Sequence, residues 1–308
     1  MAKVLLGMSG GVDSSTAAAL LMRAGHEVIG ATLVMHDLHE KDAAAAKTVA
    51  AALGIPHHTV DMREDFEKFV LSPFVSEYEK GRTPNPCIEC NERIKFGAML
   101  DYALENGCDG IATGHYAKIE EKDGRYLLKR SESAKDQSYF LCQLNQFQLS
   151  KAIFPLEGMD KEEIRLKAEK AGLPVARKGD SQEICFVPND DYISYLASLG
   201  VTSPKGKFID KDGNVLGEHN GIINYTIGQR KGLGAFGKPM FVTGMNAENN
   251  TVTIGENGSQ YSRGLIADKM NFIAFEELNP NTLIISGFTF SPSTLIANLL
   301  LFLISSLV

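Results

Sequence analysis

Tryptophan is absent from the 308-residue sequence, and cysteine is scarce, with only five residues. So few cysteines in a chain of this length exclude a disulfide-stabilised secreted scaffold. The sequence also lacks the charged leader, hydrophobic run and small-residue cleavage site of a signal peptide. We therefore expect a cytoplasmic protein, in which paired cysteines serve catalysis or metal binding rather than structural disulfides.

An excess of basic residues is also absent. The 31 lysines and arginines are outnumbered by 38 aspartates and glutamates, and the formal net charge is −7. A globally basic surface drives non-specific phosphate contact, so this charge argues against indiscriminate nucleic-acid binding and leaves room for a local basic patch. With 44% hydrophobic residues, the chain can form about two domains with a substantial core.

Long uncharged hydrophobic runs are missing except at the C-terminal end. Residues 278–308 carry no ionisable side chain, but Pro292 and Ser293 interrupt them and leave about 14 apolar residues, where a membrane-spanning helix needs about 20. We expect no membrane association. The tail is interpreted either as a buried or self-associating terminal helix or as a departure from the parent reading frame, with a true transmembrane helix as the less favoured alternative.

Hydrophobic strands that alternate with helical patterns predict a parallel α/β sheet in the first 200 residues. A strand at 3–8, a glycine turn, a helix at 14–23 and a strand at 27–34 form the repeating unit of such sheets. Apolar spacing and turn residues predict the remaining elements. These are a helix at 42–53, a strand at 58–61, a helix at 62–79, a loop at 81–91, a helix at 92–105, a strand at 110–114, a hairpin around 122–125, and helices at 161–171 and 190–199.

From residue 203 the pattern changes to short strands and turns. Strands at 207–209 and 215–216 flank one turn, and strands at 240–245 and 251–254 flank another. We therefore predict three parts, which are an α/β catalytic domain over 1–200, a central β-rich domain over 201–270, and an altered C-terminal part with the apolar tail over 271–308.

A phosphate-binding loop is predicted at Ser9-Gly10-Gly11-Val12-Asp13-Ser14, between the first strand and the first helix. The glycines let the backbone approach an anion, and the helix N-terminus offers unpaired N–H groups. Asp13 can hold Mg²⁺ beside a pyrophosphate. The segment lacks the Walker and dinucleotide-fold patterns and resembles instead the loop of enzymes that cleave ATP to AMP and pyrophosphate. The alternative is an ordinary glycine turn with a helix cap.

The cysteines form a second candidate site. Cys87 and Cys90 make a C-x-x-C motif before a predicted helix, where Arg93 and Lys95 are expected to lower a thiol pKa. Cys185 lies in a separate polar loop. Three interpretations stay open: Cys90 and Cys185 as a persulfide and nucleophile pair, all three cysteines as ligands of a [4Fe–4S] cluster, or inert buried thiols. A zinc site is not expected, because no second C-x-x-C and no suitably spaced histidine pair accompany them.

Three polar motifs have weaker signals. His115 follows a strand at the carboxyl edge of the sheet, where open α/β sheets bind ligands, although a lone histidine is often structural. Lys135-Asp136-Gln137 is either a substrate-contacting loop or a polar loop with a helix cap. Arg230 and Lys231 lie among glycines within residues 201–240, which hold six basic and three acidic residues. That local excess suits phosphate contacts, and a solvated hairpin is the alternative.

In combination these motifs resemble the bacterial tRNA-specific 2-thiouridylase family. The resemblance covers residues 2 to about 278. It rests on Gly7-Met8-Ser9-Gly10-Gly11-Val12-Asp13-Ser14, Gly81-Arg82-Thr83-Pro84-Asn85-Pro86, Cys90-Asn91 with Ile94-Lys95-Phe96, Ala112-Thr113-Gly114-His115-Tyr116, Lys135-Asp136-Gln137-Ser138-Tyr139, Asp180-Ser181-Gln182-Glu183-Ile184-Cys185-Phe186 and residues 225–232.

The resemblance implies a fold and a reaction. The fold is an adenine-nucleotide α-hydrolase-like (PP-loop) domain, a smaller β-rich tRNA-binding domain and a C-terminal β-barrel, which is incomplete here. The reaction is ATP-dependent adenylation of C2 of the wobble uridine in tRNA, followed by sulfur transfer from a cysteine persulfide to give 2-thiouridine, AMP and pyrophosphate. ATP and Mg²⁺ are the implied cofactors. The implied partners are tRNAs of the Lys, Glu and Gln type, a cysteine desulfurase and sulfur-relay carrier proteins.

The resemblance also implies a set of site residues, which divide by expected role, and no metal ligand is assigned among them. The catalytic residues are Cys90, Cys185 and Asp13. The ATP-binding residues are Gly7, Met8, Ser9, Gly10, Gly11, Val12, Asp13, Ser14, Met35 and Gly114. The tRNA-binding residues are Asn85, Pro86, Cys87, His115, Lys135, Asp136, Gln137, Arg230 and Lys231.

The sequence departs from the family pattern at three places. The segment between Met35 and Ala43 is short, Cys87 stands where many members have aspartate, and no Arg-Tyr-Arg-type tRNA contact follows Asn281. Two alternatives therefore accompany the thiouridylase assignment. One is a tRNA thiolase whose [4Fe–4S] cluster is held by Cys87, Cys90 and Cys185, and the other is a non-catalytic tRNA-binding remnant.

Overall fold

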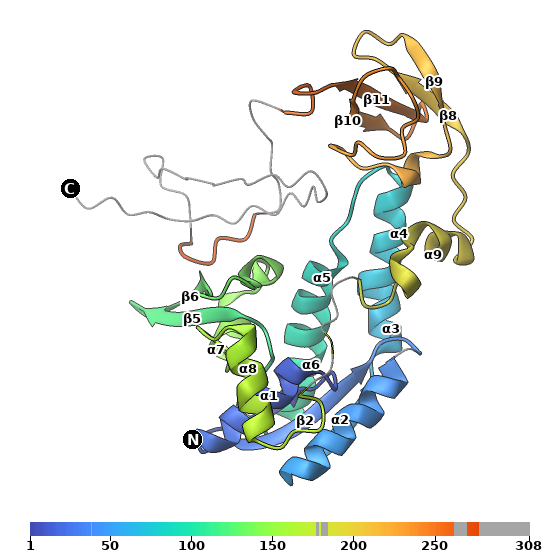
Figure 1. Cartoon of the computed structure of the whole chain (residues 1–308). Helices are drawn as coiled ribbons and strands as arrows, with labels where there is room; N and C mark the ends of the chain where they lie inside the picture. Colours follow the sequence, from blue (N-terminus) through green and yellow to red (C-terminus); the bar gives the residue numbers. More distant parts are fainter. Residues whose placement is uncertain (38, 177–178, 180–183, 262–269, 277–308) are drawn as a thin grey trace, which may run out of the picture.

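The computed structural model describes residues 1–37, 39–176, 179, 184–261 and 270–276. Its larger part is an α/β domain built on a five-stranded parallel sheet in the order β3-β2-β1-β4-β7 (Figure 1). The strands are β1 (Lys3–Gly7), β2 (Glu27–Val34), β3 (His57–Asp61), β4 (Gly110–Ala112) and β7 (Ala152–Ile153). The strand order reverses between β1 and β4, and ligands of open α/β sheets bind outside the carboxyl ends at such a point.

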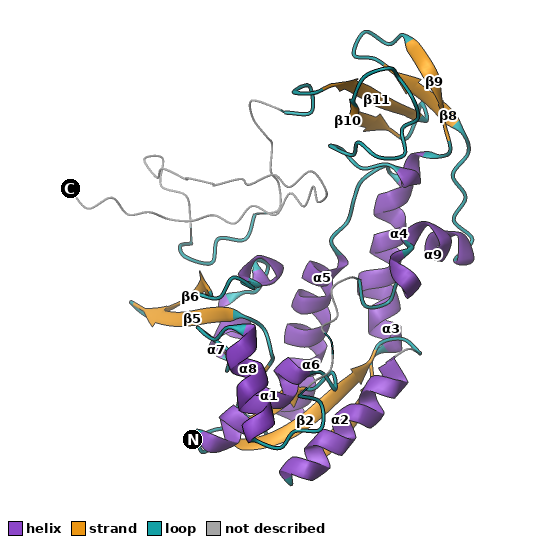
Figure 2. Cartoon of the chain, viewed as in Figure 1, coloured by secondary structure: helices purple, strands orange, loops and turns teal. Residues whose placement is uncertain are grey.

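Two hydrophobic cores flank the sheet, because alternate residues of a strand face opposite sides. Val4 and Leu6 of β1 pack with one set of helices and Leu5 packs with the other, which gives the layered arrangement in Figure 2. The first set is α1 (Val12–Arg23), α2 (His39–Leu53) and α8 (Lys161–Lys170). The second set is α3 (Arg63–Phe66), the π-helical segment η1 (Glu67–Leu71), α4 (Ser72–Glu79), the π-helical segment η2 (Cys90–Ala98) and α6 (Met99–Glu105).

The predicted loop over 81–91 is wrong in its second half, since a helix begins within it. Helix α5 spans Pro86–Glu89 and continues through η2 into α6. Asn85 caps α5 by accepting a hydrogen bond from the Cys87 N–H at 3.2 Å. Proline cannot continue a helix but is well suited to its first position, where no N–H partner is needed. Cys87 and Cys90 therefore lie on the first turns of a helix rather than in a loop.

Smaller elements complete the α/β domain. The predicted hairpin is confirmed as β5 (Ala117–Lys122) and β6 (Arg125–Arg130), which pair antiparallel. The other short elements are η3 (Ser138–Leu141), α7 (Gln146–Ser150), η4 (Pro188–Asp190) and α9 (Tyr192–Ser198). Tyr192 of α9 stacks on Tyr78 of α4 with ring centroids 4.9 Å apart and donates a hydrogen bond to the carbonyl of Ile223. This stack connects the α/β domain to the chain that follows.

The second domain is a four-stranded sheet in the order β10-β11-β8-β9, at the far end of the molecule from the parallel sheet (Figure 1). Its elements are β8 (Gly206–Ile209), β9 (Val215–His219), η5 (Ile222–Asn224), β10 (Met240–Asn246) and β11 (Thr251–Glu256). Both predicted strand pairs are present and antiparallel. The predicted fold class, a parallel α/β domain followed by a smaller β-rich domain, is confirmed.

The predicted incomplete barrel and apolar tail lie almost entirely outside the described residues. Residues 270–276 dock on the α/β domain, where Asn271 donates to the carbonyl of Leu144 at 2.9 Å and Arg125 donates to the carbonyl of Ile273 at 2.9 Å. Within the part of the chain that the structure describes, no helix has the length and apolar character to cross a membrane.

Candidate active site

The loop after β1 forms a tight cradle at the carboxyl edge of the sheet. Gly10 has a φ of 66°, and a Cβ at this position would lie 2.8 Å from the carbonyl oxygen of Asp42. The Ser14 hydroxyl accepts a hydrogen bond from the Ser9 N–H at 3.2 Å, so it closes the loop over the start of α1. The two requirements at Gly10, a left-handed backbone and close approach to α2, explain why the position is glycine.

A second glycine brings the neighbouring strand against this loop. A Cβ at Gly114, just after β4, would lie 3.0 Å from the Ser14 nitrogen. The next residue, His115, is buried, and its Nδ1 lies 2.7 Å from the Thr113 hydroxyl. Burial, assisted by the Lys95 charge, holds the pKa of His115 well below its ordinary value. The imidazole is therefore neutral at neutral pH.

A cavity of about 250 Å³ opens over these two loops. Predicted ATP-binding residues in its wall are Gly7, Met8, Ser9, Asp13, Ser14, Met35 and Gly114, and the predicted tRNA-binding residues there are His115 and Gln137. Gly10, Gly11 and Val12 belong to the same loop, of which Gly11 and Val12 face a second, adjacent cavity. The predicted nucleotide site is thus assembled around one concave surface.

Asp13 makes contacts that the sequence did not indicate. Lys161, the first residue of α8, places its Nζ 2.7 and 2.8 Å from the two carboxylate oxygens of Asp13. The hydroxyl of Tyr116 donates to the same carboxylate at 2.8 Å. A cation from α8 and a phenol from the loop between β4 and β5 therefore contact Asp13, and both residues face the second cavity.

The second cavity, of about 430 Å³, contains the cysteines. Cys87, Cys90 and Cys185 all line it, together with the predicted residues Pro86, Lys135 and Gln137. The two cavities share the following wall residues: Ser9, Asp13, Met35, His39, Asp42, Lys95 and Gln137. The nucleotide loop and the thiols, which are far apart in the sequence, thus face one continuous hollow.

The expected lowering of the thiol pKa values is wrong. Burial raises the pKa of Cys90 and of Cys87, and it raises the pKa of Cys185 to about 12. Lys95 acts on all three thiols in the expected direction, but desolvation outweighs its charge. Arg93 is exposed and pairs with Glu92 at 3.2 Å.

The thiols are nevertheless unpaired and close enough to influence one another. All five cysteines are free. Cys90 is 7% exposed, with its sulfur 3.8 Å from the Met35 sulfur. Cys185 retains considerable exposed surface as a residue, yet the charges of Cys90 and Cys87 contribute to its raised pKa. The three sulfurs therefore share one environment, in which Lys95 is the common cation.

Among the remaining residues predicted to contact tRNA, some have a polar atom without a hydrogen-bond partner, and others already bond within the protein. Asn85 has a buried Nδ2 without a hydrogen-bond partner among the described residues, so this donor is available to a ligand. The Asp136 carboxylate instead accepts from the Ser131 N–H at 2.8 Å and from the Ser138 hydroxyl at 2.9 Å. Gln137 accepts from the Tyr116 N–H. Asp136 and Gln137 thus order their loop, and contact with tRNA stays a prediction.

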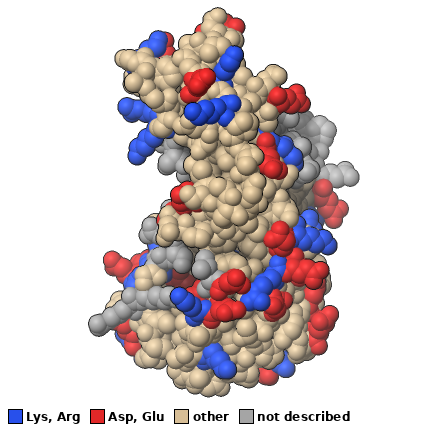
Figure 3. All heavy atoms as spheres, turned by 90° about the vertical axis from the view of Figure 1, so that its right-hand side faces the viewer, with Lys and Arg blue, Asp and Glu red and all other residues tan. Residues whose placement is uncertain are grey.

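Arg230 and Lys231 lie in the β-rich domain, outside both cavities. Both are exposed, and Figure 3 shows basic side chains projecting from this end of the molecule. Their loop is connected to the cysteine segment by a hydrogen bond between the hydroxyls of Thr83 and Thr226, 3.0 Å apart. A substrate that spans both regions would follow this connection.

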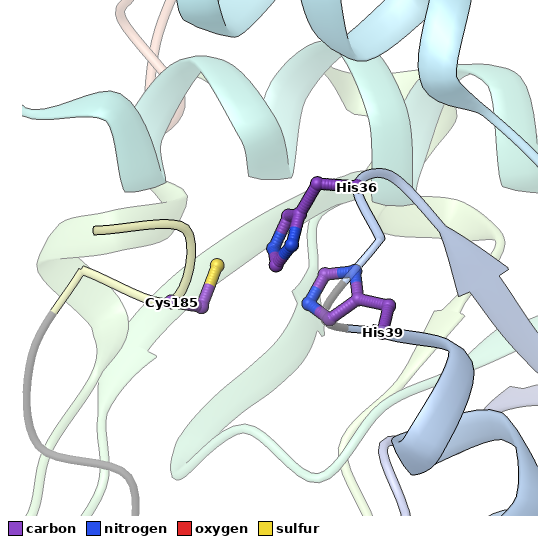
Figure 4. A group of neighbouring side chains, drawn as sticks. All are labelled: His36, His39 and Cys185. Carbon is purple, nitrogen blue, oxygen red and sulfur yellow. The ribbon is translucent and has the colours of Figure 1, made fainter. Parts of the chain in front are cut away.

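A histidine pair that the sequence argument overlooked lies beside Cys185. His36 lies between β2 and α2, and His39 is the first residue of α2. One donor atom of each lies within 4.8 Å of the other and of the Cys185 sulfur (Figure 4). The expectation that no suitably spaced histidine pair accompanies the cysteines is therefore wrong. The only signal was the His-x-x-His spacing, which does not reveal its distance from residue 185.

Comparison with known families agrees with this architecture. Residues 2–189 match a family model described as "tRNA methyl transferase HUP domain", and residues 194–256 match "tRNA methyl transferase PRC-barrel domain". The chain thus belongs to a class of proteins in which a HUP domain is followed by a PRC-barrel domain.

Individual relatives narrow the class. The tRNA-specific 2-thiouridylase MnmA of Treponema denticola is 50% identical over 88% of this chain and 78% of its own length. The protein of the same name from Acetivibrio thermocellus is 49% identical over 90% of this chain and 82% of its own length. The chain belongs to the tRNA-specific 2-thiouridylase family, as its motifs predicted.

Proposed function

We propose that this protein is an ATP-dependent tRNA 2-thiouridylase that converts the wobble uridine of tRNA to 2-thiouridine. The observation that carries the proposal is the continuous hollow in which the phosphate loop, Asp13, Cys90 and Cys185 meet. A small-molecule adenylating enzyme has no need of thiols facing its nucleotide site. Family membership supplies tRNA as the substrate.

The first step is adenylation of the base. The uracil C2 oxygen attacks the α-phosphate of ATP, and pyrophosphate leaves. The N–H groups at the start of α1, the Ser9 and Ser14 hydroxyls and Lys161 hold the phosphates and stabilise negative charge on the leaving pyrophosphate. The step turns the C2 oxygen, a poor leaving group, into a phosphate ester.

The second step is sulfur transfer. A terminal persulfide sulfur on Cys185 attacks C2, AMP leaves, and a disulfide joins Cys185 to the base. The Cys90 sulfur then attacks the Cys185 sulfur and forms a Cys90–Cys185 disulfide, while the bond to the transferred sulfur breaks and leaves 2-thiouridine. The two thiols supply the two electrons that the sulfur gains, and an external thiol reductant restores them. Both cysteines line one cavity, and neither is in a disulfide.

Magnesium is the divalent ion that this donor set suits. The Asp13 carboxylate, the Asp42 carboxylate and the Ser9 hydroxyl in the cavity walls offer the oxygen ligands that Mg²⁺ prefers. The ion supplies neutralisation of phosphate charge. Since Lys161 already contacts Asp13, ATP binding requires this lysine to move from the carboxylate toward the phosphates.

The bound base faces the cysteine end of the hollow. Surrounding the flipped uracil are Pro86, Cys87, His115 and the Asn85 amide, whose Nδ2 has no hydrogen-bond partner among the described residues. A base in a single-stranded anticodon loop is cheap to extrude. Lys135, Arg230 and Lys231 contact phosphates. The substrates are tRNAs of the Lys, Glu and Gln type, the sulfur comes from a cysteine desulfurase through relay carriers, and the enzyme works in the cytoplasm.

The experiment that tests the proposal is a thiolation assay with wild-type protein, Cys90→Ser and Cys185→Ser. Each receives ATP, Mg²⁺, a persulfide donor and unmodified tRNA, and wobble 2-thiouridine is measured by nucleoside mass spectrometry. Cys142→Ser is the matched control, because Cys142 lines neither cavity. The mechanism is supported if the wild type and Cys142→Ser form 2-thiouridine and if Cys90→Ser and Cys185→Ser do not. tRNA binding without thiolation in every sample would instead support the non-catalytic remnant.

A second candidate is a thiolase whose [4Fe–4S] cluster is held by Cys87, Cys90 and Cys185. The observation that favours it is that the three cysteines line one cavity and stand close enough to affect each other's pKa, as a cluster with three cysteine ligands requires. The cluster would supply an open iron site for a sulfide. Anaerobic purification tests it, since a broad visible absorbance that disappears in Cys87→Ser supports the cluster and a colourless active protein contradicts it.

A further inference from the structure

We propose that His36, His39 and Cys185 form a binding site for a zinc-class metal ion in the wall of the sulfur-transfer cavity. One nitrogen of each histidine and the cysteine sulfur all lie within 4.8 Å of one another. Figure 4 shows the sulfur directed toward the two imidazole rings. The three residues come from two segments that are far apart in the sequence and meet at the carboxyl edge of the sheet.

An unsatisfied nitrogen points to a ligand. The Nε2 of His36 is buried and has no hydrogen-bond partner among the described residues. Buried polar atoms of native proteins nearly always have a partner, because an unpaired one costs free energy. His39 uses its Nδ1 to accept from the Met35 N–H at 3.4 Å, and this bond leaves its Nε2 as the second available nitrogen.

The surroundings hold the two rings in position. Their centroids lie 3.8 Å apart, and Phe66 and Phe186 pack against His36 at 5.8 and 6.5 Å. Zinc bonds are about 2.0–2.1 Å to nitrogen and about 2.3 Å to sulfur, so ligand atoms in a tetrahedral site lie about 3.5 Å apart. A contraction of about 1 Å, which side-chain rotation can supply, would therefore complete the site.

The donor set selects the kind of metal. Two imidazoles and a thiolate are borderline and soft ligands that suit Zn²⁺ and its neighbours, whereas Mg²⁺ prefers oxygen. Binding at this site would therefore not compete with the magnesium that accompanies ATP. Three protein ligands leave the fourth tetrahedral position to water.

The consequence for catalysis rests on the proposed function. Metal binding replaces the Cys185 S–H proton, which is released to solvent, with a metal–sulfur bond. The bound sulfur can no longer accept sulfur from a carrier, so occupation of the site would reversibly prevent persulfide loading.

The test is an anaerobic titration of the reduced, chelator-treated full chain with Co²⁺, followed by displacement with Zn²⁺. Tetrahedral Co²⁺ bound to a thiolate gives charge-transfer and visible bands. His36→Gln, His39→Asn and Cys185→Ser should each weaken binding by at least about 100-fold, because changes that only reorient a ligand already cost about 10–100-fold. His26→Ala is the control, because His26 precedes β2 at the opposite edge of the sheet. Far-ultraviolet circular dichroism and urea unfolding confirm that each variant is folded.

A second readout identifies the sulfur. One equivalent of Zn²⁺ should protect the wild-type Cys185 from iodoacetamide, as measured by peptide mass spectrometry, and should not protect it in His36→Gln. Absence of thiolate–Co²⁺ bands in the wild type overturns the site. So does binding that is abolished in Cys87→Ser or Cys90→Ser but unchanged in the histidine variants, since the ligands would then be the cysteines alone.

The thiolation assay separates this proposal from the proposed function. A protein that thiolates tRNA but binds no metal through these histidines contradicts only the metal site. A protein that binds metal through His36, His39 and Cys185 but never thiolates tRNA contradicts only the proposed reaction.

Discussion

Burial and charge compete at the cysteines, and burial is the stronger effect. Lys95 lowers the pKa values of Cys87, Cys90 and Cys185, but desolvation raises them further. Oxidants and electrophiles react with the thiolate rather than the thiol. The unloaded enzyme therefore keeps its thiols protonated and protected at neutral pH, although they face a cavity.

Lys161 should act on the phosphates of ATP, and its replacement tests this role. Lys161→Met removes the cation that contacts both Asp13 oxygens, and loss of one preorganised charge-stabilising group typically costs about 10²–10³ in kcat. Lys167→Met is the control, since Lys167 lies on the same helix and pairs with Glu163 at its surface. Pyrophosphate release in the presence of tRNA is the measurement, and equal rates in the two variants would contradict the role.

His115 should make stability depend on pH. Burial holds its pKa well below the ordinary value, so the folded protein keeps the imidazole neutral while the unfolded chain binds a proton below about pH 6.5. The stability is fully present above about pH 6.5 and falls as the pH decreases, by up to about 1.4 kcal/mol per pH unit for this group.

Urea unfolding of the wild type and His115→Gln at pH 7 and pH 5.5 measures this contribution. The variant should lose less stability between the two pH values than the wild type. The same loss in both proteins would show that His115 is not the group responsible.

Several site residues could be predicted from the sequence and others could not, for a physical reason. Asp13, Cys90 and Cys185 lie in motifs whose residue types define a chemistry, and the structure places them around one hollow. Lys161 contacts Asp13 across 148 residues of sequence, and His36 meets Cys185 through folding alone. Such contacts depend on strand order, which local patterns do not encode.

At the scale of elements, the phosphate loop is the tightest part of the site. Gly10→Ala should impair both stability and ATP binding, because its Cβ would meet the Asp42 carbonyl and the Ala45 Cβ in addition to the left-handed backbone. Gly54→Ala is the matched control, with a φ of 70° and no neighbour within 4 Å of the added Cβ.

Gly54→Ala measures the free-energy cost of a Cβ on a left-handed backbone by itself, which is about 1–2 kcal/mol. Urea unfolding and binding of a fluorescent ATP analogue measure the two effects. If Gly10→Ala binds the analogue as tightly as Gly54→Ala, then α2 moves to accommodate the added methyl group, and the expected loss of ATP binding is contradicted.

Most long elements follow from apolar periodicity, whereas short ones such as β7 and α7 were not predicted. Strands β1 and β2 and helix α1 agree with their predicted ranges to within two residues. The start of α5 is an instructive case. The sequence pattern does not reveal it, because Pro84 and Pro86 are both typical helix breakers. The Asn85 side chain caps the helix and Pro86 occupies its first position, so the same residue types that end a helix can also begin one.

At the scale of the whole molecule, the predicted nucleotide site lies in the α/β domain, and Arg230 and Lys231 lie in the β-rich domain. Arg230→Gln with Lys231→Gln should weaken tRNA binding and reduce the slope of log affinity against log salt by about one for each phosphate that is no longer neutralised. Lys238→Gln is the control, because Lys238 in the same domain pairs with Glu256. An unchanged slope in the double variant would remove these two residues from the tRNA interface.

In the proposed reaction, the sulfur of 2-thiouridine passes through Cys185. The direct measurement is a single turnover in which the protein is loaded with an isotopically labelled persulfide, freed of excess donor, and mixed with ATP, Mg²⁺, tRNA and unlabelled sulfide. We expect labelled sulfur in the wobble nucleoside and a Cys90–Cys185 disulfide in the protein. Unlabelled 2-thiouridine, with the label still on the protein, would contradict it.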